Sequence, residues 1–129
     1  MGGNTELLLD IAPDELRRLG VSVEKVRLSM HEIKPCTECR YCVGRGSCRI
    51  DYGMSSVLIP KLLSADIVVA SPLYFNNVSS YVKLFMDRAC CIRGKLRNKV
   101  GGGIVVGRAE TLDCSFSHRS ISFRASQRY

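Results

Sequence analysis

An α/β domain built on a parallel sheet is the fold class that this 129-residue chain predicts. Segments with helical spacing alternate with short strand-like runs, which is the pattern of βαβ units. The second strand-like segment begins with a continuous apolar run, as expected for a strand that is buried on both faces. The length fits one domain, and neither a repeat nor a low-complexity linker divides the chain.

The first half of the chain predicts two helices, a strand and a loop. Apolar residues recur at helical spacing over residues 5–20. Pro13 lies inside this segment, so we expect a kink there or a division into two helices. Residues 21–28, VSVEKVRL, alternate imperfectly and predict a strand. After a cysteine-rich loop, residues 54–65 predict a second helix, with a local irregularity at Pro60.

The second half continues the alternation. Residues 66–75 predict a buried strand, residues 78–92 a helix and residues 99–107 a third strand. Beyond the third strand the sequence is rich in Ser and Arg and has neither strand nor helix periodicity. We therefore expect one domain over residues 1–108 and an irregular tail over residues 109–129.

The formal net charge is +7, from 19 basic and 12 acidic residues. Aromatic residues that would stack on bases do not alternate with the basic ones, so we expect an anionic cofactor or an acidic electron-transfer partner rather than nucleic acid. The chain shows neither a long apolar window nor a signal-peptide pattern, so we expect no membrane partner and a cytoplasmic location. There, clustered cysteines more often bind metal or do redox chemistry than form disulfides.

Four of the seven cysteines are spaced C-x2-C-x2-C-x5-C, namely Cys36, Cys39, Cys42 and Cys48. Three thiols at intervals of three on an irregular loop can converge on one centre, and the fourth can fold back to close it. Gly44 and Gly46 would supply the return turn. This pattern suits a 4Fe-4S cubane, which needs one thiolate at each iron corner. Zinc is the main rival, although structural zinc sites usually use two C-x2-C pairs separated by a longer spacer.

The other cysteines lack this spacing, and we expect them to be small buried hydrophobic residues: Cys90, Cys91 and Cys114. The two histidines are isolated from each other and from any nucleophile or carboxylate pair. We therefore assign no catalytic residue.

Two further stretches have the composition of a ligand site. GGNTE, residues 2–6, places glycines, an amide and a hydroxyl at a helix N-terminus, a pattern that binds phosphate, although a plain N-cap is the commoner use. SPLYFNNVSS, residues 71–80, follows a strand, and ligands of open parallel sheets bind beyond the carboxyl ends of strands. Its proline and aromatic residues offer a flat apolar surface that suits a planar heteroaromatic ring. VGR, residues 106–108, could add a third wall.

With these stretches the chain resembles the iron–sulfur flavoproteins, a branch of the flavodoxin-like NADPH-dependent FMN reductase superfamily. The matching segments are GGNTELLL, IKPCTECRYCVGRGSC, ADIVVASPLYFNNVSSYVKLFMDR and LRNKVGGGIVVGR. The resemblance implies a flavodoxin-like open parallel sheet in the order 2-1-3-4-5, FMN at its switch point and a 4Fe-4S cluster close by. It also implies a homodimer, or a dimer of dimers, in which one subunit's cluster lies near another subunit's flavin.

Composition and resemblance together assign the cofactor contacts. The expected FMN contacts are Asn4, Thr5, Ser71, Pro72, Leu73, Tyr74, Phe75, Asn76, Val78, Ser79, Gly107 and Arg108. The expected cluster ligands are Cys36, Cys39, Cys42 and Cys48. Asp87 and Arg88 fall on a helix near the implied dimer interface, where we expect an ion pair or a helix-packing role.

The chain departs from the family pattern at both ends. The family's first strand does not precede GGNTE, and its Gly-rich stretch, helix and last strand do not follow VGR. We expect a truncated or frameshifted reading frame.

The function predicted for the intact protein is electron transfer through FMN and the cluster, between a donor such as ferredoxin or NAD(P)H and an acceptor. The alternatives are an NAD(P)H-dependent FMN or quinone reductase with a structural cysteine loop, a zinc-stabilised binding module, and a chain that binds no flavin.

Overall fold

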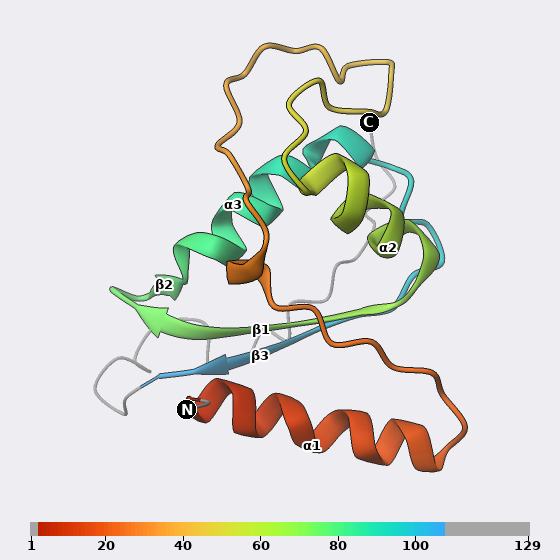
Figure 1. The fold of residues 1–129 in the computed structure, drawn as a ribbon, viewed down its shortest axis with the longest axis vertical. Helices are drawn as coiled ribbons and strands as arrows, with labels where there is room; N and C mark the ends of the chain where they lie inside the picture. The colour runs from red at the N-terminus through yellow and green to blue at the C-terminus, as the bar shows by residue number, and fades with distance from the viewer. Residues whose placement is uncertain (1–2, 108–129) are drawn as a thin grey trace.

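The structure is a computed structural model that describes residues 3–107. Its elements form three layers (Figure 1), with helix α1, Asn4–Arg18, on one side of a small sheet. Helices α2, Ile59–Ser64, and α3, Ser80–Ala89, lie on the other side. Helices on both faces of an open sheet confirm the predicted flavodoxin-like α/β class.

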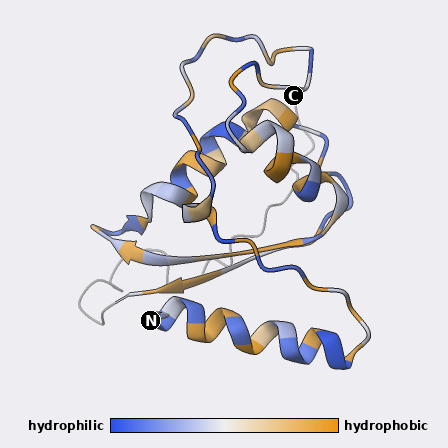
Figure 2. Cartoon of the chain, in the orientation of Figure 1, coloured by the Kyte–Doolittle hydropathy of each residue, from blue (hydrophilic) through white to orange (hydrophobic). Residues whose placement is uncertain are grey.

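The sheet is built on two parallel strands, β1, Ile67–Tyr74, and β3, Gly101–Val106. They are hydrogen-bonded neighbours over six paired positions, and the strand order is β2-β1-β3. Strand β1 is hydrophobic along most of its length and β3 along its second half, whereas α1 alternates between hydrophobic and hydrophilic residues (Figure 2). Because β1 and β3 are parallel, their carboxyl ends meet at one edge of the sheet. Strands β1 and β3 confirm the two strands predicted over residues 66–75 and 99–107.

A short hairpin follows β1. Strand β2, Asn77–Val78, pairs antiparallel with the end of β1, so that Leu73 lies opposite Val78. Phe75 and Asn76 connect the two strands with φ angles of 48° and 61°. Two central residues with positive φ are what a type I′ hairpin turn requires. A two-residue strand is too short to show a periodicity, so β2 has no signature in the sequence.

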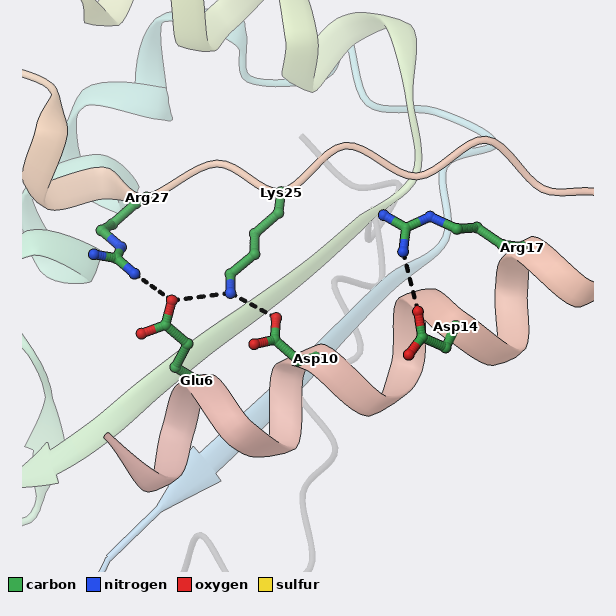
Figure 3. Close-up of polar contacts among 6 residues, drawn as sticks. All are labelled: Glu6, Asp10, Asp14, Arg17, Lys25 and Arg27. Atoms are coloured by element: carbon green, nitrogen blue, oxygen red, sulfur yellow. Dashed lines mark hydrogen bonds and ion pairs between the residues drawn. The ribbon is translucent and has the colours of Figure 1, made fainter. Parts of the chain in front are cut away.

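The strand predicted over residues 21–28 does not form. The 2-1-3-4-5 order places another strand between this segment and β1, and the described part of the chain contains none there, so the segment has no ladder partner. It is held by ion pairs to α1 instead (Figure 3). The Lys25 amine lies 3.0 Å from the Glu6 carboxylate and 2.5 Å from that of Asp10. Arg27 also pairs with Glu6, and the hydrogen bonds from Lys25 and Arg27 lower the pKa of Glu6.

Helix α1 passes through Pro13 without dividing, so the predicted split does not occur. Pro13 is the buried residue of this helix, and burial of its ring offsets the backbone hydrogen bond that proline cannot donate. The rest of the apolar face is only partly covered where α1 lies against β1 and β3. Leu8 and Ile11 remain 47% and 61% exposed.

The hydrophobic core lies between the sheet and the other two helices. The predicted helix over 54–65 is confirmed with its irregularity: a π-helical turn, Met54–Leu58, precedes α2, and Pro60 falls in the first turn of α2. The core residues are Ile33, Met54, Leu58, Ile59, Leu62, Phe85, Cys91 and Ile92. Cys42 and Cys48 pack against this core, so the cysteine loop is anchored to it. No helix in the described range is both long and apolar enough to cross a membrane.

Two methionines test where the core lies. Met54 is fully buried and Met30 is 74% exposed. We expect Met54→Ala to lower the free energy of unfolding by about 2–5 kcal/mol, because truncation leaves a cavity. The matched Met30→Ala change is expected to stay within about 0.5 kcal/mol. Urea denaturation followed by circular dichroism measures both, and equal effects would contradict this placement of the core.

Candidate cofactor sites

One open pocket collects six thiols. The space between its lining atoms, together with the open solvent above them, amounts to about 310 Å³. The cysteine loop forms it together with the end of α3 and the 3-10 turn that follows, Cys90–Ile92. Its lining residues are Cys36, Cys39, Arg40, Cys42, Cys48, Ile50, Arg88, Cys90 and Cys91. All four cysteines of the motif thus reach one pocket, and their role as ligands stays a prediction.

The loop curves around this pocket through left-handed backbone. Gly44 and Gly46 have φ angles of 74° and 67°, in the return turn for which glycine was expected. Glu38 and Arg40, on either side of Cys39, also have positive φ, at 51° and 54°. Residues other than glycine adopt this conformation at a cost, and such strain concentrates at functional sites.

Arg88 lies beneath the loop and is only 1% exposed. Its Nη1 atom donates a hydrogen bond of 2.7 Å to the carbonyl of Lys34. Its Nη2 atom lies 3.3 Å from the Cys48 sulfur and also donates to the carbonyl of Ile50. One buried guanidinium therefore makes three contacts with the loop. It contacts the backbone just before Cys36, the sulfur of Cys48, and the backbone just after Cys48.

Asp87 and Arg88 do not pair with each other, and each takes one of the two expected roles: Asp87 forms an ion pair, and Arg88 lies on the buried face of α3. Asp87 pairs with Lys83 one turn earlier, and Arg88 pairs with no carboxylate among the described residues. The sequence did contain a signal for Arg88. It follows Phe85 by three residues, so a charged residue interrupts the apolar face of the helix, and Val82, Phe85 and Arg88 are the buried residues of α3.

One of the two cysteines after α3 differs from the expectation. Cys91 is buried, as expected, but Cys90 is exposed, and both line the pocket. Desolvation, with a smaller effect of the Cys42 sulfur, raises the pKa of Cys90 to about 11. The pKa of Cys39 is lowered instead, chiefly by a hydrogen bond from the Tyr41 backbone.

The residues predicted to bind FMN gather at the carboxyl edge of the sheet. The N-terminus of α1 lies beside the ends of β1 and β3 there (Figure 1). Asn4 is exposed and Thr5 half-buried in the first turn of α1, where the leading backbone N–H groups lack helical acceptors. Gly107 directly follows β3. The predicted segments that lie outside the described residues are Arg108, Cys114 and the tail over 109–129.

The loop after β1 divides into a fixed base and an exposed tip. Ser71 is 2% exposed; its hydroxyl accepts the Ser79 backbone N–H at 2.9 Å and donates to the Pro72 carbonyl at 2.8 Å. The single hydroxyl proton of Ser71 is therefore donated within the loop and not to a ligand. Tyr74 and Phe75 project outward, 62% and 102% exposed. The other expected contacts are half-buried or exposed around the same hairpin: Leu73, Asn76 and Val78.

These two regions lie at opposite ends of α3 (Figure 1). The helix begins at Ser80, beside the hairpin, and ends at Ala89, beside the cysteine pocket. Ten helical residues span about 15 Å at 1.5 Å per residue. A flavin at the sheet edge and a cluster in the pocket of the same chain would therefore be separated by the length of this helix.

The pKa shifts predict an order of thiol reactivity in the iron-free protein. At pH 8 a thiol with a pKa of about 11 is roughly one-thousandth thiolate, so Cys90 should react slowly with iodoacetamide. Its rate should rise about tenfold per pH unit up to that pKa. Cys39, exposed and with a lowered pKa, should react first. Peptide mass spectrometry of the labelled chain between pH 7 and 10 measures both rates, and faster labelling of Cys90 at pH 8 would refute this order.

Known proteins resemble this chain over most of its length. An iron–sulfur flavoprotein of Methanocaldococcus jannaschii is 39% identical over 108 residues, which cover 81% of this chain and 55% of that protein. An iron–sulfur flavoprotein of Archaeoglobus fulgidus is also 39% identical over 108 residues, covering 81% of this chain and 48% of its own length. The chain thus spans about half the length of the curated relatives it matches. No solved structure is significantly similar to it.

A protein-family model also matches most of this chain. The family model described as NADPH-dependent FMN reductase matches residues 1–126. That range includes the phosphate-type N-terminus of α1, the cysteine loop, the hairpin after β1 and β3. The chain therefore belongs to the NADPH-dependent FMN reductase family.

Proposed function

We propose that the protein to which this chain belongs is an iron–sulfur flavoprotein. It would transfer electrons through FMN and a 4Fe-4S cluster, between a donor such as ferredoxin or NAD(P)H and an acceptor. The observation that carries the proposal is the single pocket that receives all four cysteines of the motif. The names of the curated relatives support it, since they are iron–sulfur flavoproteins.

The spacing C-x2-C-x2-C-x5-C favours a cluster over zinc, because structural zinc sites usually use two C-x2-C pairs separated by a longer spacer. Zinc holds four sulfurs at about 2.3 Å, which brings them to roughly 4 Å from one another. A cubane places each thiolate on a different iron corner and so accepts a wider ring of ligands. Cys36, Cys39, Cys42 and Cys48 would hold it, and it would supply one-electron transfer.

The flavin would lie at the carboxyl edge of the sheet. The first turn of α1 offers free N–H groups for a phosphate, and its acidic residue Glu6 is already paired with Lys25 and Arg27. Tyr74 and Phe75 provide exposed aromatic faces for a planar ring. The hydroxyl of Ser79 makes no capping bond to α3, so it is free to contact a polar edge. FMN would supply the exchange between two-electron and one-electron transfer.

The separation of the two regions along α3 supports a dimeric assembly. Within one chain the helix length divides the sheet edge from the cysteine pocket. A homodimer, or a dimer of dimers, would shorten this path if the pocket of one subunit faced the flavin of another. An NAD(P)H-dependent flavin reductase remains the second candidate, because the matching family is named for that activity.

Reconstitution distinguishes these functions. After anaerobic incubation with iron, sulfide and FMN, we expect the wild-type chain and Cys90→Ser to bind about four irons and to show the absorption and EPR signals of a 4Fe-4S cluster. Cys42→Ser, which removes a motif cysteine from the same pocket, should lose most of the iron. A flavin spectrum without cluster signals would favour the reductase, and zinc bound with neither cofactor would favour a binding module.

The exposed aromatic residue at the hairpin tip tests the flavin position. We expect Phe75→Ala to weaken FMN binding by about 1 kcal/mol, roughly fivefold in Kd, because a stacking surface is lost. Stability should hardly change, since the Phe75 side chain is fully exposed. Quenching of FMN fluorescence measures the Kd, and Tyr52→Ala, an exposed aromatic on another segment, is the control. Equal Kd values for all three proteins would place the flavin elsewhere.

A further inference from the structure

The guanidinium of Arg88 is a buried positive charge with an unfilled hydrogen-bonding position. Arg88 is 1% exposed and forms no ion pair with a carboxylate within the described residues. Its Nε atom is buried and has no hydrogen-bond partner in the same part of the chain. A guanidinium stays protonated in proteins, and a buried charge without a counter-charge is strongly unfavourable. These two observations indicate an anionic group beside Arg88.

The position of Arg88 identifies that group. Arg88 lines the same pocket as the motif cysteines, and its Nη2 atom contacts the Cys48 sulfur at 3.3 Å. None of the described residues that line the pocket is an Asp or Glu that would neutralise the charge. Four thiolates around iron and sulfide carry a net negative charge. An iron–thiolate centre in this pocket would thus provide both the counter-charge and acceptors for the remaining N–H.

The same guanidinium also holds the ends of the loop. It donates to the carbonyl of Lys34, two residues before Cys36, and to the carbonyl of Ile50, two residues after Cys48. A planar fork can hold both carbonyls at once, whereas the single ammonium of a lysine cannot do so with the same geometry. Arg88 therefore fixes the separation of the loop ends before any iron binds.

We propose that Arg88 is the positioning residue of the iron–sulfur centre, closing the base of the cysteine loop and supplying the positive charge that balances the cluster. The inference rests on the proposed iron–sulfur function. One-electron reduction adds one negative charge to the cluster and neither makes nor breaks a bond at Arg88. A fixed positive charge at the Cys48 sulfur stabilises the reduced state more than the oxidised state, so Arg88 raises the reduction potential.

Three variants of the full chain separate the charge of Arg88 from its packing. Arg88→Gln removes the charge, Arg88→Lys keeps the charge without the fork, and Arg93→Gln makes the same change at an exposed arginine five residues on. After anaerobic reconstitution with iron and sulfide, the readouts are iron content, the midpoint potential from an EPR-monitored dithionite titration, and the thermal midpoint of the iron-free chain.

We expect Arg93→Gln to match wild type throughout. Arg88→Gln should load less iron and titrate at a more negative potential. Arg88→Lys should load less iron than wild type and return toward the wild-type potential.

These outcomes distinguish a purely structural role of Arg88 from its proposed role at the iron–sulfur centre. If Arg88→Gln and Arg88→Lys lower the thermal midpoint but load iron fully at the wild-type potential, Arg88 is only structural and the inference is wrong. If Arg88→Gln is folded by circular dichroism yet binds no iron, closure of the loop by Arg88 is supported, and a wild-type-like potential of Arg88→Lys then supports the role of its charge. If the wild-type chain itself takes up no iron and sulfide, the proposed function fails, and this inference fails with it.

Discussion

The hydrogen bonds of Arg88 hold together the two ends of the cysteine loop. They join the end of α3 to both ends of the cysteine loop, and α3 is in turn part of the hydrophobic core through Phe85. A loop of this length has few hydrophobic residues with which to fix its own shape. The buried guanidinium substitutes for them, because three directional bonds from one rigid group determine where the loop begins and ends. The cysteine pocket therefore depends on a residue 40 positions away from Cys48.

The second constraint is the parallel pairing of β1 and β3. It brings two strand ends and the first turn of α1 to one edge, where α/β proteins bind their ligands. Helix α3 starts at this edge and ends at the cysteine pocket, so a single rigid element sets the distance between the two candidate cofactor sites. Ser71 stabilises this arrangement, because its hydroxyl accepts the Ser79 backbone N–H and so holds the loop after β1 against the start of α3. The exposed hairpin tip is thus carried on a fixed base.

Local patterns predicted those elements whose hydrophobic residues face a partner within the chain. Residues 54–65 and 66–75 formed the expected helix and strand, because the packing they need lies between α2, α3 and β1. Residues 21–28 have comparable alternation but no neighbouring strand in the described part of the chain, and a strand without a ladder is not stable. Pro13 was expected to kink or divide α1, yet the helix continues through it and the Pro13 ring is buried. In both cases tertiary contacts outweighed the local preference.

The sequence by itself determined the chemistry: four cysteines at short intervals, a phosphate-type helix start, and a strand followed by aromatic and polar residues, in an order that identifies the family. Spacing along the chain was enough for this, because those residues act through segments that are close in sequence. Only the tertiary structure decided which residues complete the cysteine pocket. Arg88, Cys90 and Cys91 reach it from the end of a helix some 40 residues downstream of the motif's last cysteine. No local periodicity predicts such a contact, because the contact depends on how α3 packs on the core and on where the cysteine loop folds over the end of α3.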